Sequence, residues 1–167
     1  MSLLSQTTQQ QNKETKSAPG NVLEQLVISA LSERGYCEFE NRSSQIFENR
    51  LAIGGKQYVR HLPVGRTIYD NPRKSDLYIV NRQLFPEDLI IECKWQQTSG
   101  SVDEKYPFLV QNIKKTQIPT IILIDGNGYK PGALKWLKSQ VNQDNNSLVA
   151  VWSIADFKKN ISEGYFG

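Results

Sequence analysis

An uninterrupted apolar run, Leu89-Ile90-Ile91, lies near the middle of the 167-residue chain and ends directly in Glu92-Cys93-Lys94. Consecutive apolar residues bounded by charges are typical of a short strand that is buried on both faces. The segment Pro119–Asp125 repeats this pattern. Along the chain the predicted order is a helix, a meander of strands, a helix, a strand, a helix and a strand, which indicates a mixed α/β protein with helices covering a central sheet.

Other segments supply the elements that would surround these strands. Apolar residues recur at helical spacing in three segments, which predict helices at residues 21–34, 102–116 and 130–141. Alternation and composition predict shorter strands at 57–62, 66–69, 75–80, 88–94 and 148–152, and a helical turn at 155–159. Residues 36–50 fit either a strand or a loop, 51–56 fit a strand that enters a turn, and 70–74 form a turn with Arg73 and Lys74 at its tip.

The domain organisation follows from length and composition. A chain of 167 residues has room for one core, which we place at residues 19–167. Residues 1–18 are rich in Gln, Thr, Lys and Ser without an apolar pattern, so we expect a disordered tail there. The chain has neither a signal-peptide pattern nor an apolar stretch of membrane-spanning length. A cytoplasmic protein without a membrane partner is therefore expected.

The residue counts exclude several kinds of functional site. Two cysteines, Cys37 and Cys93, cannot build a disulfide scaffold or a four-ligand zinc site. A single histidine, His61, excludes His-rich metal sites and argues against a Ser-His-Asp triad. Any chemistry is therefore left to carboxylates, lysines and hydroxyls.

One group of charged residues stands out against this background. Glu92 and Lys94 are two apart on one expected strand and so share a face, whereas Cys93 points the other way. Asp76 opens the preceding strand and would lie beside Glu92 if the two strands pair as a hairpin. Two adjacent carboxylates repel unless a cation joins them, and oxygen ligands favour Mg²⁺ or Mn²⁺. The alternative, ordinary ion pairs at strand ends, fits poorly with charges that directly follow a buried run.

The pattern Ser75-Asp76 … Glu92-Cys93-Lys94 resembles the PD-(D/E)xK phosphodiesterase superfamily, which includes many restriction endonucleases. The resemblance covers roughly residues 20–157, and Ser75 stands where the motif has a proline that binds no metal. It implies a restriction-endonuclease-like fold, a mixed β-sheet flanked by helices. It also implies that Asp76 and Glu92 bind the metal, that the Cys93 carbonyl adds a third oxygen, and that Lys94 is the catalytic lysine.

Two further residues are candidates for this site. Members of the superfamily often carry a glutamate on the first helix that reaches the metal, and Glu24 fits, with Gln25 and Glu33 as fallbacks. Glu24 is equally explained as a first-turn acid favoured by the helix dipole. Gln96 falls on the strand face of Lys94, where it could contact the site water or a phosphate, or simply be a solvated strand end.

The distribution of charge suggests a polyanionic partner. Residues 56–74 hold five lysines and arginines against one aspartate, a net charge of +4 without His61. Residues 102–141 hold six lysines against three carboxylates, a net charge of +3. Solvated surface charge explains any one of these residues, but the block just before the acidic strand favours DNA. The residues expected to contact phosphates are Arg60, Arg66, Arg73, Lys74 and Lys105, with Tyr58, Tyr69 or Tyr129 against sugars or bases.

The resemblance implies a metal-dependent endonuclease that hydrolyses the phosphodiester bonds of double-stranded DNA. Mg²⁺ is the expected cofactor and Mn²⁺ a possible substitute. A type II restriction enzyme acting as a homodimer or higher homo-oligomer is the leading hypothesis. The alternatives are a homing endonuclease, a junction resolvase or a repair nuclease of the same fold, a non-catalytic DNA-binding subunit, and a structural domain in which the motif is accidental.

Overall fold

The computed structural model describes residues 19–39, 55–97, 103–143 and 147–167. The tail expected at residues 1–18, the strand expected to begin at residue 51 and most of the ambiguous segment 36–50 lie outside the described residues. The six-stranded mixed sheet has the order β1-β2-β5-β6-β7-β8. Its strands are β1 (Cys37–Glu38), β2 (Gln57–Arg60), β5 (Leu77–Val80), β6 (Leu89–Trp95), β7 (Thr120–Asp125) and β8 (Leu148–Ser153).

The two apolar runs form adjacent strands near the middle of the sheet. Strand β6 pairs antiparallel with β5, so that Leu77 lies opposite Ile91. On its other side β6 pairs parallel with β7, which places Ile121 beside Ile91. All three of these side chains are buried. The expectation of two strands covered on both faces is therefore confirmed.

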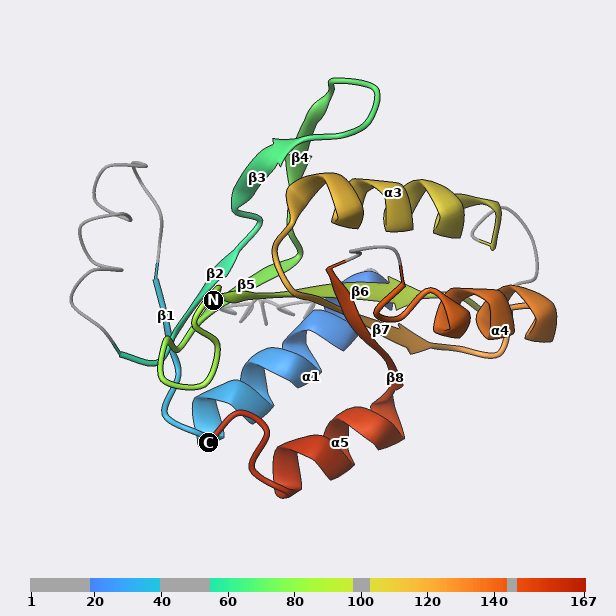
Figure 1. Ribbon diagram of the computed structural model, residues 1–167. Coiled ribbons are helices and arrows are strands. Elements are labelled where there is room, and N and C mark those ends of the chain that lie inside the picture. Colours follow the sequence, from blue (N-terminus) through green and yellow to red (C-terminus); the bar gives the residue numbers. More distant parts are fainter. Residues whose placement is uncertain (1–18, 40–54, 98–102, 144–146) are drawn as a thin grey trace, which may run out of the picture.

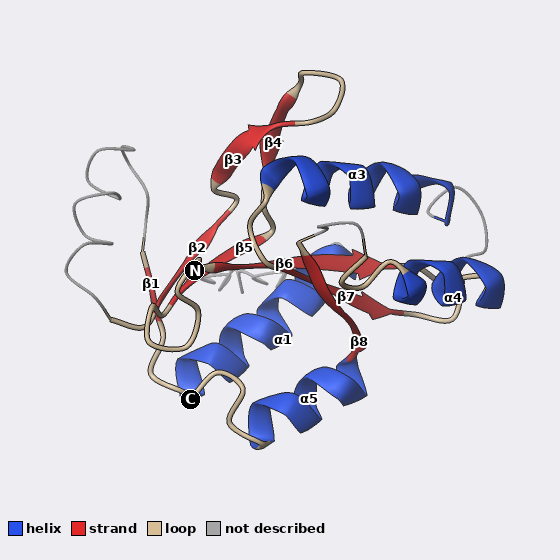
Figure 2. Ribbon diagram, viewed as in Figure 1, coloured by secondary structure: helices blue, strands red, loops and turns tan. Residues whose placement is uncertain are grey.

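Helices cover both faces of this sheet (Figures 1 and 2). Helices α1 (Pro19–Glu33) and α5 (Ile154–Ser162) lie on one face, and α3 (Tyr106–Thr116) and α4 (Pro131–Ser139) lie on the other. Cys93 packs into the core on the α1 face, whereas Ile90 belongs to a separate apolar cluster on the opposite face. This alternation confirms that Cys93 points away from Glu92 and Lys94. The mixed α/β fold class is also confirmed.

Several element boundaries differ from those expected. The helix expected from residue 102 begins with the 3-10 turn η1 (Asp103–Lys105), because Pro107 lacks an N–H and fits only the first turn of α3. The helical turn expected at 155–159 is the nine-residue helix α5. A reciprocal capping box between Ser153 and Asp156 satisfies the first backbone donors of α5 and sets its start. No helix in the described part of the chain is long and apolar enough to cross a membrane.

A two-stranded sheet, β3 (Pro63–Arg66) and β4 (Pro72–Lys74), stands beside α3 on the same face of the main sheet (Figure 1). This hairpin corrects two expectations, the strand at 66–69 and the turn at 70–74. The turn lies earlier because Thr67 and Asn71 close it with a backbone hydrogen bond of 2.8 Å and Asp70 takes a left-handed φ of 61°. Pro72 fits the edge of a two-stranded sheet, where its missing N–H costs no ladder bond.

Candidate active site

The antiparallel pairing of β5 and β6 brings the predicted acidic residues together. Asp76 directly precedes β5, and its Oδ2 atom accepts a hydrogen bond of 2.8 Å from the backbone N–H of Cys93. Lys94 Nζ lies 2.9 Å from Asp76 Oδ2 and 2.9 Å from Glu92 Oε2. The two carboxylates therefore converge on a single cation, as expected for neighbouring anions in a partly buried place.

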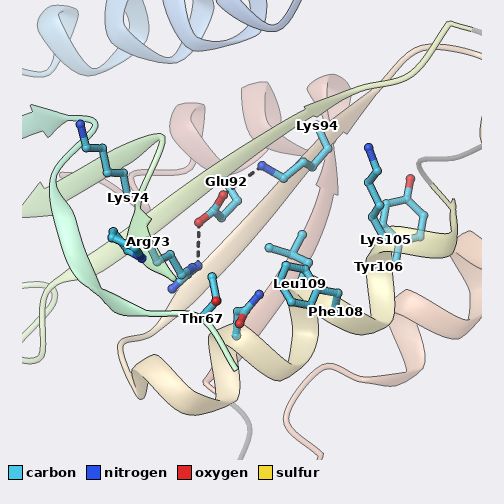
Figure 3. Close-up of a pocket in the computed structure, with 11 residues that line it drawn as sticks. Thr67, Arg73, Lys74, Glu92, Lys94, Lys105, Tyr106, Phe108 and Leu109 are labelled. Carbon is cyan, nitrogen blue, oxygen red and sulfur yellow. Dashed lines mark hydrogen bonds and ion pairs between the residues drawn. The ribbon is translucent and has the colours of Figure 1, made fainter. Parts of the chain in front are cut away.

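Glu92 has a second cationic partner that the sequence did not indicate. The Arg73 guanidinium of β4 donates to Glu92 Oε1 over 2.7 Å, and it also donates to the Thr116 hydroxyl at the end of α3. The side chains of Arg73 and Glu92 are 7% and 5% exposed. Figure 3 shows Glu92 between Arg73 and Lys94. Arg73 is thus a buried part of the site and does not lie at the tip of an exposed turn.

The electrostatics keep Lys94 charged. Burial by itself lowers the pKa of the Lys94 ammonium, but attraction to Glu92 and to Asp76 outweighs burial and raises the pKa above its ordinary value. Lys94 is consequently a hydrogen-bond donor and a positive charge in this arrangement. Burial, with a smaller contribution from Asp76, raises the pKa of the Cys93 thiol, so that side chain stays a neutral part of the core.

The first helix also contributes to the site. Glu24 of α1, His61 and Asp76 each have a potential ligand atom within 4.8 Å of the others. Burial, and then repulsion by Asp76, raises the pKa of Glu24. Gln25 and Glu33 are exposed, and Glu24 alone of the three candidates belongs to this cluster of ligand atoms.

Sequence reasoning missed the place of His61. Its Nε2 atom lies 3.8 Å from Glu24 Oε2, and its backbone N–H donates to the Asp76 carbonyl over 3.2 Å. His61 directly follows β2, the strand that pairs with β5. The sequence signal that could have placed His61 beside Asp76 is its position at the end of β2, because β2 pairs with β5 and Asp76 directly precedes β5.

The side chains fit a divalent cation that prefers oxygen. Asp76 and Glu92 each have an oxygen 2.9 Å from the Lys94 nitrogen, so the two carboxylates flank one position that a cationic group occupies. Around Asp76, Glu24 supplies a further carboxylate and His61 an imidazole, with ligand atoms within 4.8 Å of one another, and Glu92 is not part of this group. Carboxylates suit Mg²⁺ and Mn²⁺, and an added imidazole suits Mn²⁺ better than Mg²⁺.

Gln96 lies in a separate buried network. Its side-chain amide donates to Asp103 Oδ1 over 3.2 Å and to the Gly128 carbonyl over 3.1 Å, and its oxygen accepts from the Tyr106 hydroxyl. The side chain therefore ties the end of β6 to η1 and to the turn after β7. It is 2% exposed, which corrects the alternative of a solvated strand end.

Substitution of Gly126 by alanine is expected to destabilise the protein by at least about 2 kcal/mol. Gly126 has a φ of +102°, and a Cβ atom there would lie 2.0 Å from the Gln96 carbonyl oxygen. Gly132 in α4 is the matched control, because a Cβ there meets nothing within 4 Å. Urea unfolding of both variants checks this prediction, and equal midpoints for the two would contradict it.

A pocket of about 330 Å³ opens beside Glu92 and Lys94. It lies between β4, β6 and α3, and Phe108 and Leu109 of α3 form its apolar wall (Figure 3). Lys74 and Lys105, two of the expected phosphate-binding residues, line it and are exposed. Of the other three, Arg66 is exposed in the hairpin, and Arg60 is partly buried with a guanidinium nitrogen 3.6 Å from Glu24 Oε2. Arg73 is buried against Glu92, which corrects its expected place among the exposed phosphate-binding residues.

A family model described as a PD-(D/E)XK nuclease superfamily domain matches residues 15–164 of the chain. This range contains every element of the main sheet and all the candidate residues named above. Neither the curated proteins nor the solved structures gave a significant match.

Proposed function

The chain belongs to the PD-(D/E)XK nuclease superfamily, and on this premise we propose that it is a metal-dependent endonuclease that hydrolyses phosphodiester bonds in double-stranded DNA. One observation carries the proposal: Asp76 and Glu92 converge on the same Lys94 nitrogen at 2.9 Å. These side chains border a pocket to which Lys74 and Lys105 bring positive charge. The arrangement suits a phosphate group next to a metal ion.

Each site residue has a role in this proposal. Asp76, Glu92 and the Cys93 carbonyl would hold Mg²⁺ or Mn²⁺, with Glu24 close enough to assist. A bound ion of this kind polarises the scissile phosphate and lowers the pKa of a coordinated water. The Lys94 ammonium donates a hydrogen bond to the attacking water or to a phosphate oxygen and so stabilises developing negative charge. Arg73 positions Glu92 by donating a hydrogen bond to its Oε1 atom.

The biological form we favour is a type II restriction-type enzyme that acts as a homodimer. One chain provides one set of Asp76, Glu92 and Lys94, whereas cleavage of both strands needs two sets. A two-fold symmetric dimer matches the two antiparallel strands of a duplex. Homing endonucleases, junction resolvases and repair nucleases would use the same chemistry. A non-catalytic DNA-binding subunit is disfavoured, since such a relative would usually have lost one of the three residues.

The proposal is tested by incubating the purified protein with plasmid and phage DNA in Mg²⁺, in Mn²⁺ and in EDTA, with RNA of matched length in parallel. We expect metal-dependent cleavage of DNA that EDTA stops. Sequencing of the ends would locate the cuts, and their ligation without prior phosphorylation would show 5′-phosphates. The Asp76→Asn variant, purified in the same way, controls for contaminating nucleases. Metal-dependent cleavage of RNA alone, or no cleavage in either metal, would overturn it.

A further inference from the structure

The β3–β4 turn is held firmly against α3. The backbone N–H of Ile68 donates to the Asn112 side chain over 2.8 Å, and Asn112 is itself buried. Lys115 Nζ donates to the Thr67 carbonyl over 2.9 Å. These contacts fix the turn at two consecutive residues. The side chains it presents are therefore held in place before any partner binds.

This fixed turn displays two large apolar side chains to solvent. Tyr69 is 72% exposed and Ile68 is 41% exposed. The Tyr69 ring stacks on Phe108 of α3, with ring centres 5.1 Å apart and planes at 23°. Of the three tyrosines expected to meet sugars or bases, Tyr58 is buried and Tyr129 packs against the core, so Tyr69 is the exposed one. Phe108 covers one face of the Tyr69 ring, and the high exposure leaves the other face open.

The stacked pair stands at the edge of the candidate active site. Phe108 lines the pocket that Glu92 and Lys94 also line. Exposed Arg66 lies at the base of the turn, where it pairs with Asp70 at 3.3 Å, and exposed Lys74 is on the neighbouring strand. An open aromatic face next to a pocket that Lys74 and Lys105 line matches the way proteins stack bases while binding the backbone.

We infer that Tyr69 is a stacking platform for a nucleobase that leaves the helical stack beside the scissile phosphate. This inference rests on the proposed nuclease function and names the form of DNA that the site prefers. Ile68 would enter the gap, as apolar side chains do when they wedge between adjacent base pairs. Unstacking a paired base costs free energy, so DNA that already has an unpaired nucleotide at this position binds more tightly than intact duplex.

The test measures DNA binding in Ca²⁺ to two otherwise identical duplexes, one of which carries a single unpaired 2-aminopurine. For the wild type we expect tighter binding to the second duplex and a change in aminopurine fluorescence on binding. Tyr69→Ala should lose about tenfold in affinity for that duplex and lose the fluorescence change, whereas Tyr69→Phe and Tyr69→Trp keep both. Trp136→Ala removes a partly exposed aromatic ring of α4, outside the pocket, and should change neither.

The outcomes separate this inference from the proposed function. If the wild type cleaves DNA and Tyr69→Ala binds both duplexes as the wild type does, the inference is wrong and the nuclease function stands. The same holds if Tyr69→Phe loses as much affinity as Tyr69→Ala. If the wild type neither binds nor cleaves either duplex, the proposed function fails and the inference fails with it. Melting temperatures of the variants show that each one is folded.

Discussion

Replacement of Lys94 by alanine is expected to slow Mg²⁺-dependent DNA cleavage by at least ~100-fold, the effect of one electrostatic or acid–base group. The Lys94 ammonium lies 2.9 Å from both carboxylates, and in the proposed mechanism it therefore borders the metal-bound phosphate, where negative charge would develop during hydrolysis. An interaction made mainly in the transition state costs rate and not affinity when it is removed. DNA affinity in Ca²⁺ should accordingly stay close to that of the wild type.

Two other variants make this result specific. Asp76→Asn removes charge from a proposed metal ligand, so it should lose cleavage together with metal-dependent DNA binding. Lys105→Ala removes an exposed cation from the same pocket, and it should weaken binding and lower the salt slope by about one unit without slowing the saturated rate. Single-turnover cleavage and binding titrations at several salt concentrations give these quantities. A Lys94→Ala enzyme as fast as the wild type would reduce Lys94 to a structural ion-pair partner.

The features of the site that could be predicted from the sequence are those with a local signature. Glu92 and Lys94 are two positions apart on an apolar strand, and strand periodicity alone puts them on one face. Asp76 required one more assumption, a hairpin between β5 and β6, and the antiparallel register bears that assumption out. The two apolar runs likewise identified β6 and β7, because a short continuous apolar run bounded by charges is typical of a strand buried on both faces.

The remaining features depend on contacts between distant segments. Arg73 looked like an exposed turn residue, and only the packing of the β3–β4 hairpin beside α3 brings it to Glu92. His61 reaches Glu24 because β2 pairs with β5 and because α1 packs against β6, the next strand of the sheet. Gln96 looked available to substrate, yet its partners come from η1, α3 and the turn at Gly128. Each of these contacts joins residues from different segments of the chain, so no local sequence pattern predicts it.

Replacement of Arg73 by methionine is expected to destabilise the protein by about 3 kcal/mol, the scale for removing one partner of a buried ion pair. Arg73 and Glu92 are both almost fully buried and lie 2.7 Å apart. Methionine fills much of the space left by the arginine, so the loss reports on charge and hydrogen bonding more than on a cavity. Lys94 still neutralises some of the Glu92 charge, which keeps the loss below the upper end of that scale. Urea unfolding measures it.

A second substitution tests the cause of that loss. If the cost comes from leaving the Glu92 carboxylate buried with one cation fewer, Glu92→Gln should recover some of the stability in the Arg73→Met background.

Arg66→Met is the matched control, because the Arg66 side chain is 57% exposed and pairs with exposed Asp70 in the same hairpin. Its effect should stay within about 0.5 kcal/mol. Equal losses for Arg73→Met and Arg66→Met would mean that the buried pair contributes no more than a surface one. The hairpin would then be held to the site by its contacts with α3, through Asn112 and Lys115.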